Sequence, residues 1–226
     1  MAHPLDNPAW FALTERQALQ GERSDRAARF LPAISPMGAL REVSSAALGE
    51  LAELIGSDPV ALLSEQPQLP PHDLQLLRSV PVRQFCCDTP IDAVELPATP
   101  LGGADAPDMV ALVALTEPGP FAPRTVELGS YFGIRQGDRL LALAGERLKP
   151  PGWVEISGVC THPDGRGRGY AYGLVVRLTN AVLARGEGAF LYVAVGSPSE
   201  QTATAVYERA GYRFRRLMYV HSLRSR

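Results

Sequence analysis

The stretch PDGRGRGYA, residues 163–171, joins a predicted strand to a predicted helix through three closely spaced glycines. The start of a helix carries unpaired backbone N–H groups and about half a positive charge, so it suits a phosphate anion. Glycines allow close approach of the backbone and positive φ angles that turn successive N–H groups toward one oxygen. The stretch therefore predicts a phosphate-binding loop.

Other phosphate-binding patterns are excluded by the neighbouring residues. A Walker loop requires Gly-Lys-Ser/Thr, which is absent, and Tyr172 occupies the place of the third glycine in a dinucleotide fingerprint. Arginine-glycine repeats that bind RNA usually lie in disordered tails, whereas this one lies between two predicted elements. A plain glycine-rich turn remains the structural alternative.

The elements on both sides of this loop follow regular patterns. A strand is predicted over 153–161, and the following helix should bury Ala171, Leu174, Val175, Leu178 and Val182. After it come an apolar strand over 190–195, a helix with Ser197 as N-cap and Glu200 closing a capping box, and a strand over 212–221. Earlier in the chain, the pattern predicts a helix over 108–116 and strands over 131–135 and 139–145.

In the first part of the chain, the sequence predicts a helix, a strand, a second helix and a second strand, in that order. A capping box of Thr14 and Gln17 predicts a short helix, and apolar spacing predicts a helix over 45–55. A strand over 60–63, a helix over 73–78 and a strand over 82–86 follow. The proline- and glycine-rich residues 97–107 are the best domain boundary, which gives an N-terminal lobe over 1–96 and a second domain over 97–226. The two parts share an element order, through either a degenerate duplication or chance.

Three pieces of sequence together resemble a known family. RGRGYA at 166–171 matches the R/Q-x-x-G-x-G/A signature of the GNAT superfamily of acyl-CoA-dependent N-acyltransferases. VCTHP at 159–163 is similar to the end of that family's fourth strand, and VYERAGY at 206–212 is similar to its LYEKLGF. The likeness covers about 94–221 and is nearest to two-lobed, glycine N-acyltransferase-like bacterial members.

The resemblance implies an α/β fold with a mixed central sheet of splayed strands flanked by helices. A helix-rich α/β lobe, itself a candidate degenerate GNAT-like copy, would precede this sheet. The acyl donor implied is acetyl-CoA, whose pyrophosphate the loop would hold. Pantetheine would pair with Val159, Cys160 and Thr161 as an added strand. The implied phosphate-binding residues are Arg166, Gly167, Arg168, Gly169, Tyr170 and Ala171.

Two side chains are the catalytic candidates. Strand alternation places Glu155 on the face opposite Val154 and Ile156, where it could take a proton from the amine, directly or through water. Tyr207, on the packed face of the last helix, could protonate the leaving thiolate. The alternatives are a glutamate that only binds substrate or is solvated, and a structural core tyrosine. Cys160 is expected to be a backbone contributor or core residue, because no histidine spacing supports a nucleophile.

One departure from the family concerns the start of the last helix. Ser199 and Glu200 stand where many relatives have an asparagine, and the capping box already explains Glu200. A cofactor contact at this position is therefore not expected.

The amino-acid composition limits the kinds of partner that the protein is expected to bind. The chain has 226 residues, 46% hydrophobic residues and a net charge of −2, which is typical of a globular protein and does not attract nucleic acid. We expect no membrane span, no metal site, a cytoplasmic location because the three cysteines form no disulfide pattern, and a monomer or homodimer.

The sequence thus predicts an N-acetyltransferase that uses direct attack by a small-molecule or peptide amine in a ternary complex. A non-catalytic acyl-CoA sensor or partner subunit is the alternative. The N-terminal lobe is expected either to shape the acceptor cleft or to serve as an interaction domain. Which amine is accepted depends on loops such as 115–131, which carry no motif.

Overall fold

The computed structural model describes residues 3–226, which form one mixed sheet of eleven strands and five α-helices. The strand order is β1-β2-β3-β4-β11-β5-β10-β9-β8-β7-β6. The strands are β1 (Gly21–Arg23), β2 (Ala27–Phe30), β3 (Met37–Leu40), β4 (Val60–Ser64), β5 (Gln75–Cys87), β6 (Ala98–Leu101), β7 (Tyr131–Gln136), β8 (Arg139–Glu146), β9 (Trp153–Thr161), β10 (Gly188–Ala194) and β11 (Arg213–Arg224). The helices are α1 (Pro8–Thr14), α2 (Ser45–Ile55), α3 (Ala106–Thr116), α4 (Tyr170–Leu183) and α5 (Glu200–Arg209).

Two parallel strand pairs organise this sheet, and a helix connects the members of each. β3 and β4 are joined through α2, and β9 and β10 through α4, as the crossover of a parallel pair requires. The remaining neighbours are antiparallel. The mixed α/β fold and the helix-flanked central sheet expected from the resemblance are therefore confirmed.

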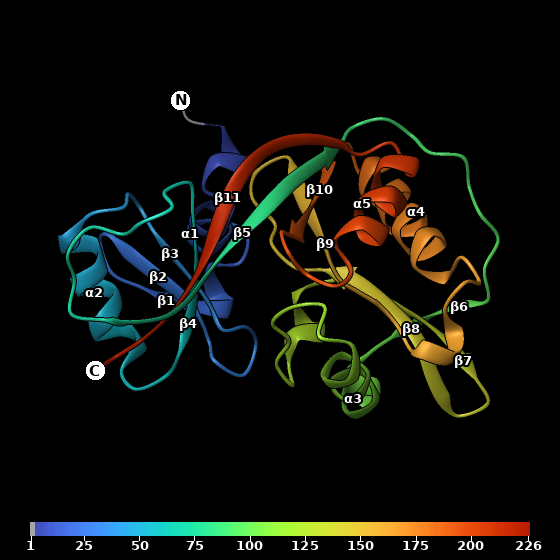
Figure 1. Cartoon of the computed structure of the whole chain (residues 1–226), viewed down its shortest axis with the longest axis horizontal. Coiled ribbons are helices and arrows are strands. Elements are labelled where there is room, and N and C mark those ends of the chain that lie inside the picture. Colours follow the sequence, from blue (N-terminus) through green and yellow to red (C-terminus); the bar gives the residue numbers. More distant parts are fainter. Residues whose placement is uncertain (1–2) are drawn as a thin grey trace.

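Strands β5 and β11 connect the two halves of the molecule. Figure 1 shows β1–β4 with α1 and α2 on one side, β6–β10 with α3–α5 on the other, and β5 and β11 running between them. β5 lies between β10 and β11 and pairs with both. The domain boundary at 96/97 stays a prediction: β5 and β11 lie on opposite sides of it in the sequence, yet they pair with each other in one continuous sheet.

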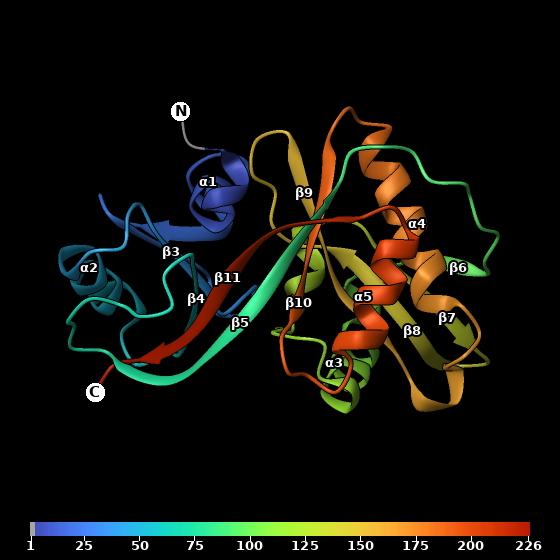
Figure 2. The ribbon, with the colours of Figure 1, turned by 45° about the horizontal axis from the view of Figure 1, so that its top comes forward.

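The apolar faces of the helices pack as their periodicity predicts. On α4, Leu174, Leu178 and Val182 are buried against the sheet, together with Tyr207 and Ala210 of α5. These two helices cover the same face of the sheet (Figure 2). The helix predicted over 45–55 is α2, and the strand predicted over 153–161 is β9, each with the predicted bounds.

Two local predictions were wrong, and three strands were not predicted, because distant partners outcompete local signals. Residues 75–78, expected in a helix, form the start of β5 and pair with the end of β11. Gln17 caps no helix; α1 ends at Thr14, and the Gln17 side chain binds another part of the chain. Strands β1–β3 carry no alternating pattern that the sequence could reveal. The suggestion of a degenerate internal copy stays a prediction.

The start of α5 also differs from its predicted capping. Ser199, not Ser197, is the N-cap residue, and it makes no side-chain capping bond. The Glu200 carboxylate accepts a hydrogen bond from the Gly196 N–H at 2.6 Å and pairs with Arg83 of β5. Glu200 therefore ties α5 to the sheet.

In the part of the chain that the structure describes, no helix is both long and apolar enough to cross a membrane. Cys86, Cys87 and Cys160 are free thiols.

A glycine on β8 makes room for a buried tyrosine on β7. Gly145 lies opposite Tyr131 in the antiparallel register, and a Cβ atom at Gly145 would lie 2.1 Å from the Tyr131 ring. Because both residues are in paired strands, the ring cannot move aside without disturbing the core.

We therefore expect Gly145→Ala to lower the free energy of unfolding by about 1–3 kcal/mol, the usual cost of overpacking. Urea denaturation measures this change. The control is Gly49→Ala in the exposed middle of α2, where a Cβ atom has nothing within 4 Å. That variant should be neutral or more stable by up to about 1 kcal/mol. Equal effects at the two positions would contradict the packing argument.

Candidate functional site

Strands β9 and β10 separate after a short paired segment. They share only the pairs Gly188–Trp153, Ala189–Val154 and Phe190–Glu155. Beyond these, residues 156–161 of β9 pair outward with β8, and residues 191–194 of β10 pair outward with β5. We call these two diverging segments the fork. Their inner edges present backbone N–H and C=O groups that an extended ligand could pair with.

A β-bulge lies on the β9 arm of the fork. Cys160 pairs with Leu143 and Ser157 with Gly145, so two residues of β9, Gly158 and Val159, lie opposite one residue of β8. Gly158 has φ +65°, a conformation that favours glycine. Bulges re-aim the backbone and side chains locally and are frequent beside active sites.

The fork leads to the glycine-rich loop at the start of α4. Gly167 and Gly169 have φ +76° and +74°, and a Cβ atom at either would face open space. The first intrahelical bond runs from Gly173 N–H to Gly169 C=O. The preceding amides, from Tyr170 onward, are therefore the unpaired donors of a 14-residue helix. This geometry fits a phosphate anion.

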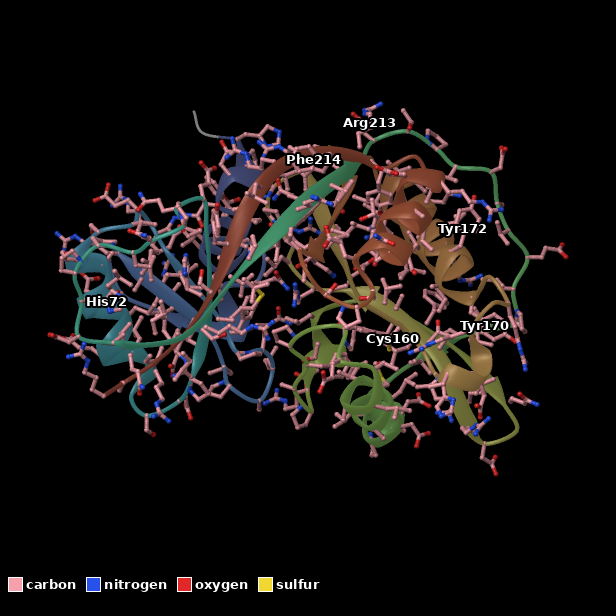
Figure 3. All side chains as sticks on the ribbon, viewed as in Figure 1. His72, Cys160, Tyr170, Tyr172, Arg213 and Phe214 are labelled. Carbon is pink, nitrogen blue, oxygen red and sulfur yellow. The ribbon has the colours of Figure 1, made fainter. Side chains whose placement is uncertain are left out.

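The loop is also rich in positive charge without acidic partners. Among residues 3–226, Arg166 and Arg168 form no ion pair, whereas most other arginines do. His162 holds the preceding turn by accepting the Asp164 N–H at 3.1 Å. Tyr170 and Tyr172 stand on the first turn of α4 (Figure 3), where Arg209 of α5 stacks on the Tyr172 ring at 4.4 Å.

The predicted pantetheine contacts occupy the β9 arm of the fork. Val159 packs against the core beneath α4, while Cys160 is buried among residues of α3, β7 and β8. Burial raises the pKa of the Cys160 thiol to about 11, so it stays protonated at neutral pH and is a poor nucleophile. The buried Thr161 hydroxyl has no hydrogen-bond partner in the described part of the chain. An orphaned polar atom at this position fits a ligand in the fork.

Tyr207 is buried on the sheet-facing side of α5, as predicted. Burial raises its pKa above the usual value, and the neighbouring Cys160 acts in the same direction. The phenol is therefore protonated at all physiological pH values. The nearby Tyr212 differs, because its hydroxyl is engaged with the Thr179 hydroxyl at 2.7 Å.

Glu155 lies on the predicted face of β9, but Arg147 holds it. Glu155 is 1% exposed, and its two carboxylate oxygens accept bonds of 2.9 and 2.5 Å from the Arg147 guanidinium. The Leu148 N–H donates a third bond at 3.3 Å. A carboxylate in such a pair is not free to take a proton from an amine.

The N-terminal lobe holds two loops beside the fork. Gln17 donates to the Arg147 C=O and accepts from the Lys149 N–H, each at 2.9 Å. Thr125 donates to the Ile34 C=O at 2.6 Å, and the Arg124 N–H donates to the Ala33 C=O at 2.8 Å. The loop between β8 and β9 and the loop after α3 are thus both fixed from this lobe.

Comparison with known proteins agrees with this geometry. The FR47-like protein family matches residues 131–220, which include the fork, the glycine loop and α5. A crystal structure assigned to the GNAT family of acetyltransferases, from Novosphingobium aromaticivorans, is 36% identical over 100% of both chains, with a TM-score of 0.90.

The chain belongs to the GNAT family of acetyltransferases.

Two more distant structures share the GNAT fold. A GCN5-related N-acetyltransferase from Kribbella flavida is 17% identical, covers 96% of this chain and 95% of its own, and has a TM-score of 0.60. A GCN5-related N-acetyltransferase-like protein from Streptococcus suis is 15% identical, covers 96% and 92%, and has a TM-score of 0.57. No curated protein matches the chain.

Sequence reasoning missed several residues of this GNAT site. Arg147 was missed because its partner Glu155 lies across a strand connection, and the bulge at Gly158 was missed because it shows only as a register shift. The glycine itself was the available signal, since an isolated glycine in a strand pattern often marks a bulge. Among residues 3–226, no group of three or more His, Cys, Asp or Glu side chains is placed to hold a metal ion.

The buried ion pair generates a stability prediction. Arg147→Met leaves the Glu155 charge buried without a partner, so the free energy of unfolding should fall by about 3–5 kcal/mol. The double variant Arg147→Met/Glu155→Leu removes both charges and should be clearly more stable than Arg147→Met. Urea denaturation of the wild type and the variants gives the coupling. Additive losses would show that the two side chains do not depend on each other.

Proposed function

We propose that the protein transfers the acetyl group of acetyl-CoA to an amine acceptor within a ternary complex. The observation that carries this proposal is the fork of β9 and β10, whose unpaired inner edges lead to a helix start shaped for phosphate. Gly167 to Ala171 would hold the diphosphate, with Arg166 and Arg168 adding positive charge. Val159 to Thr161 would pair with the extended pantetheine arm.

The chemistry requires one bond to form and one to break. The neutral amine nitrogen attacks the thioester carbonyl carbon, and the carbon–sulfur bond then breaks. Nitrogen loses a proton to water, and sulfur gains one. Tyr207 is the proposed donor to the thiolate, because its buried phenol is protonated and lies close to the β9 arm, and it regains its proton from water before the next turnover.

Glu155 is proposed as a positioning residue. Its bidentate pair with Arg147 and its bond from Leu148 N–H fix the start of β9 next to the point where the fork opens. Direct proton removal from the amine would require breaking this buried pair, which is costly. Water next to the acceptor is therefore the proposed proton acceptor.

The pairing of Glu155 with Arg147 favours a second candidate function. A fork without a free carboxylate could serve a protein that binds acyl-CoA as a sensor or partner subunit and does not catalyse transfer. Binding that persists while no amine is acetylated, with Tyr207→Phe silent in every assay, would support this candidate.

Binding of acetyl-CoA tests the phosphate site. Gly169→Ala disturbs the positive φ that aligns the loop amides, and we expect acetyl-CoA affinity by calorimetry to fall about tenfold or more. The control is Gly186→Ala at the other end of α4, where φ is +77° and a Cβ atom also faces open space. Both variants should lose similar stability, but only Gly169→Ala should lose affinity. Unchanged binding in Gly169→Ala would overturn the assigned site.

Acetyl transfer tests the proposed acid. Tyr207→Phe keeps the buried ring and removes the hydroxyl, so kcat should fall by about 10²-fold while the KM for acetyl-CoA stays close to that of the wild type. Tyr212→Phe is the matched control, because it removes a hydroxyl that bonds only within the core. It should cost about 1 kcal/mol of stability and leave kcat almost unchanged. A Tyr207→Phe enzyme with wild-type kcat would remove Tyr207 from the mechanism.

A further inference from the structure

The segment after α3 lies against the β9 arm of the fork at both of its ends. At one end, the last turn of α3, which runs to Thr116, packs on β9, with Val113 in the same buried cluster as Cys160. At the other, the Phe121 ring lies 3.9 Å from the position of a Cβ atom on Gly158. The five residues 117–121 span at most about 18 Å, so this segment stays close to the bulge at Gly158.

Two aromatic rings form a wall at the bulge. Phe121 and Tyr131 meet edge to face, with centroids 5.9 Å apart and an interplanar angle of 89°. Both rings lie 3.9 Å from the Cβ position of Gly158, which as a glycine leaves that space empty. Tyr131 is buried and supports Phe121 from behind, whereas Phe121 is only partly buried, so the ring available to a ligand is that of Phe121. Such a wall favours an aromatic or broad apolar group.

Glu117, the first residue of this segment, has two unfavourable local properties. It is the C-cap of α3 in the left-handed region, with φ +47°, and is the one non-glycine residue with positive φ in the described chain. Its exposed carboxylate also stands at the negative end of the helix dipole. Glycine or asparagine would serve this position better as a cap. A cation that approaches this position would be attracted both by the Glu117 carboxylate and by the negative end of the α3 dipole.

The neighbouring cations are already neutralised. Arg124 is paired with Glu127 at 2.6 Å, Arg147 with Glu155 at 2.5 Å, and Lys149 with Glu146 at 2.9 Å. A carboxylate on the acceptor would therefore find no free basic side chain on these loops, and it would be repelled by Glu117.

We propose that the acceptor is an arylalkylamine without a carboxylate, whose ring lies on the accessible part of Phe121, which the buried Tyr131 supports from behind, and whose ammonium is attracted by Glu117. This inference rests on the proposed acetyl transfer and narrows its substrate class. Free amino acids are disfavoured by the same charges.

Steady-state kinetics with acetyl-CoA and thiol-release detection tests this substrate class. The four acceptors are 2-phenylethylamine, n-butylamine, phenylalaninamide and phenylalanine. Burial of a phenyl ring should raise kcat/KM for 2-phenylethylamine at least about tenfold over n-butylamine. Phenylalaninamide should exceed phenylalanine by a similar factor, because the two differ chiefly in the carboxylate.

Single substitutions test which residues cause the preference for an aromatic amine. Phe121→Ala should abolish most of the advantage of 2-phenylethylamine and leave n-butylamine nearly unchanged; Phe214→Ala, at an exposed position on β11, is the control. Glu117→Asn tolerates the left-handed backbone and removes the charge, so kcat/KM should fall about fivefold at low salt and less at high salt. Glu117→Gly should also lower kcat/KM, although it relieves the backbone and raises Tm.

The outcomes separate the inference from the proposed function. Acetylation with n-butylamine or phenylalanine preferred, or a Phe121→Ala variant that keeps the aromatic preference, overturns the inference and leaves acetyl transfer intact. Binding of acetyl-CoA with no acetylation of any of the four amines overturns the inference, and it overturns the proposed transfer as well if a panel of peptide amino termini and lysine peptides also releases no thiol.

Discussion

The constraint on which the site depends is that β9 and β10 pair over only three residues. A parallel pair in the middle of a sheet normally continues, because each unpaired buried N–H or C=O group is costly. Here each arm is satisfied on its outer side, by β8 or by β5, and the inner edges remain available. The bulge at Gly158 and the opening loop of α4 both follow the point of separation, so in the proposed function one backbone feature would place the donor, the reacting carbon and the phosphates.

Keeping the fork open requires support from the rest of the molecule. The buried Arg147–Glu155 pair lies at the last paired position of β9 and ties it to the loop from β8. The N-terminal lobe in turn holds that loop through Gln17 and the loop after α3 through Ile34. β5 enters the sheet beside β10 and continues across both halves (Figure 1). The N-terminal part is thus joined firmly to the half that contains the fork, and its expected role in shaping the acceptor cleft stays a prediction.

The sequence was informative where local chemistry decides the structure. The glycine loop, β9, α2 and the buried faces of α4 and α5 follow from residue spacing, because a glycine-rich helix start and an apolar stripe act over a few residues. It was misleading where a distant partner decides. Residues 75–78 become strand only because β11 pairs with them, Gln17 leaves its expected capping role to bridge the lobes, and Glu155 has the predicted face but is held by Arg147. The aromatic wall of Phe121 and Tyr131 carries no pattern at all, since the residues meet through folding.

The central claim is that the open inner edges of the fork and the first amides of α4 receive one extended ligand. Amide hydrogen exchange, with and without saturating acetyl-CoA, tests it most directly. The account predicts slower exchange in residues 156–171 and 191–194 together, and little change in β1–β4. Slower exchange confined to other surfaces, with the fork and the loop unaffected, would contradict it.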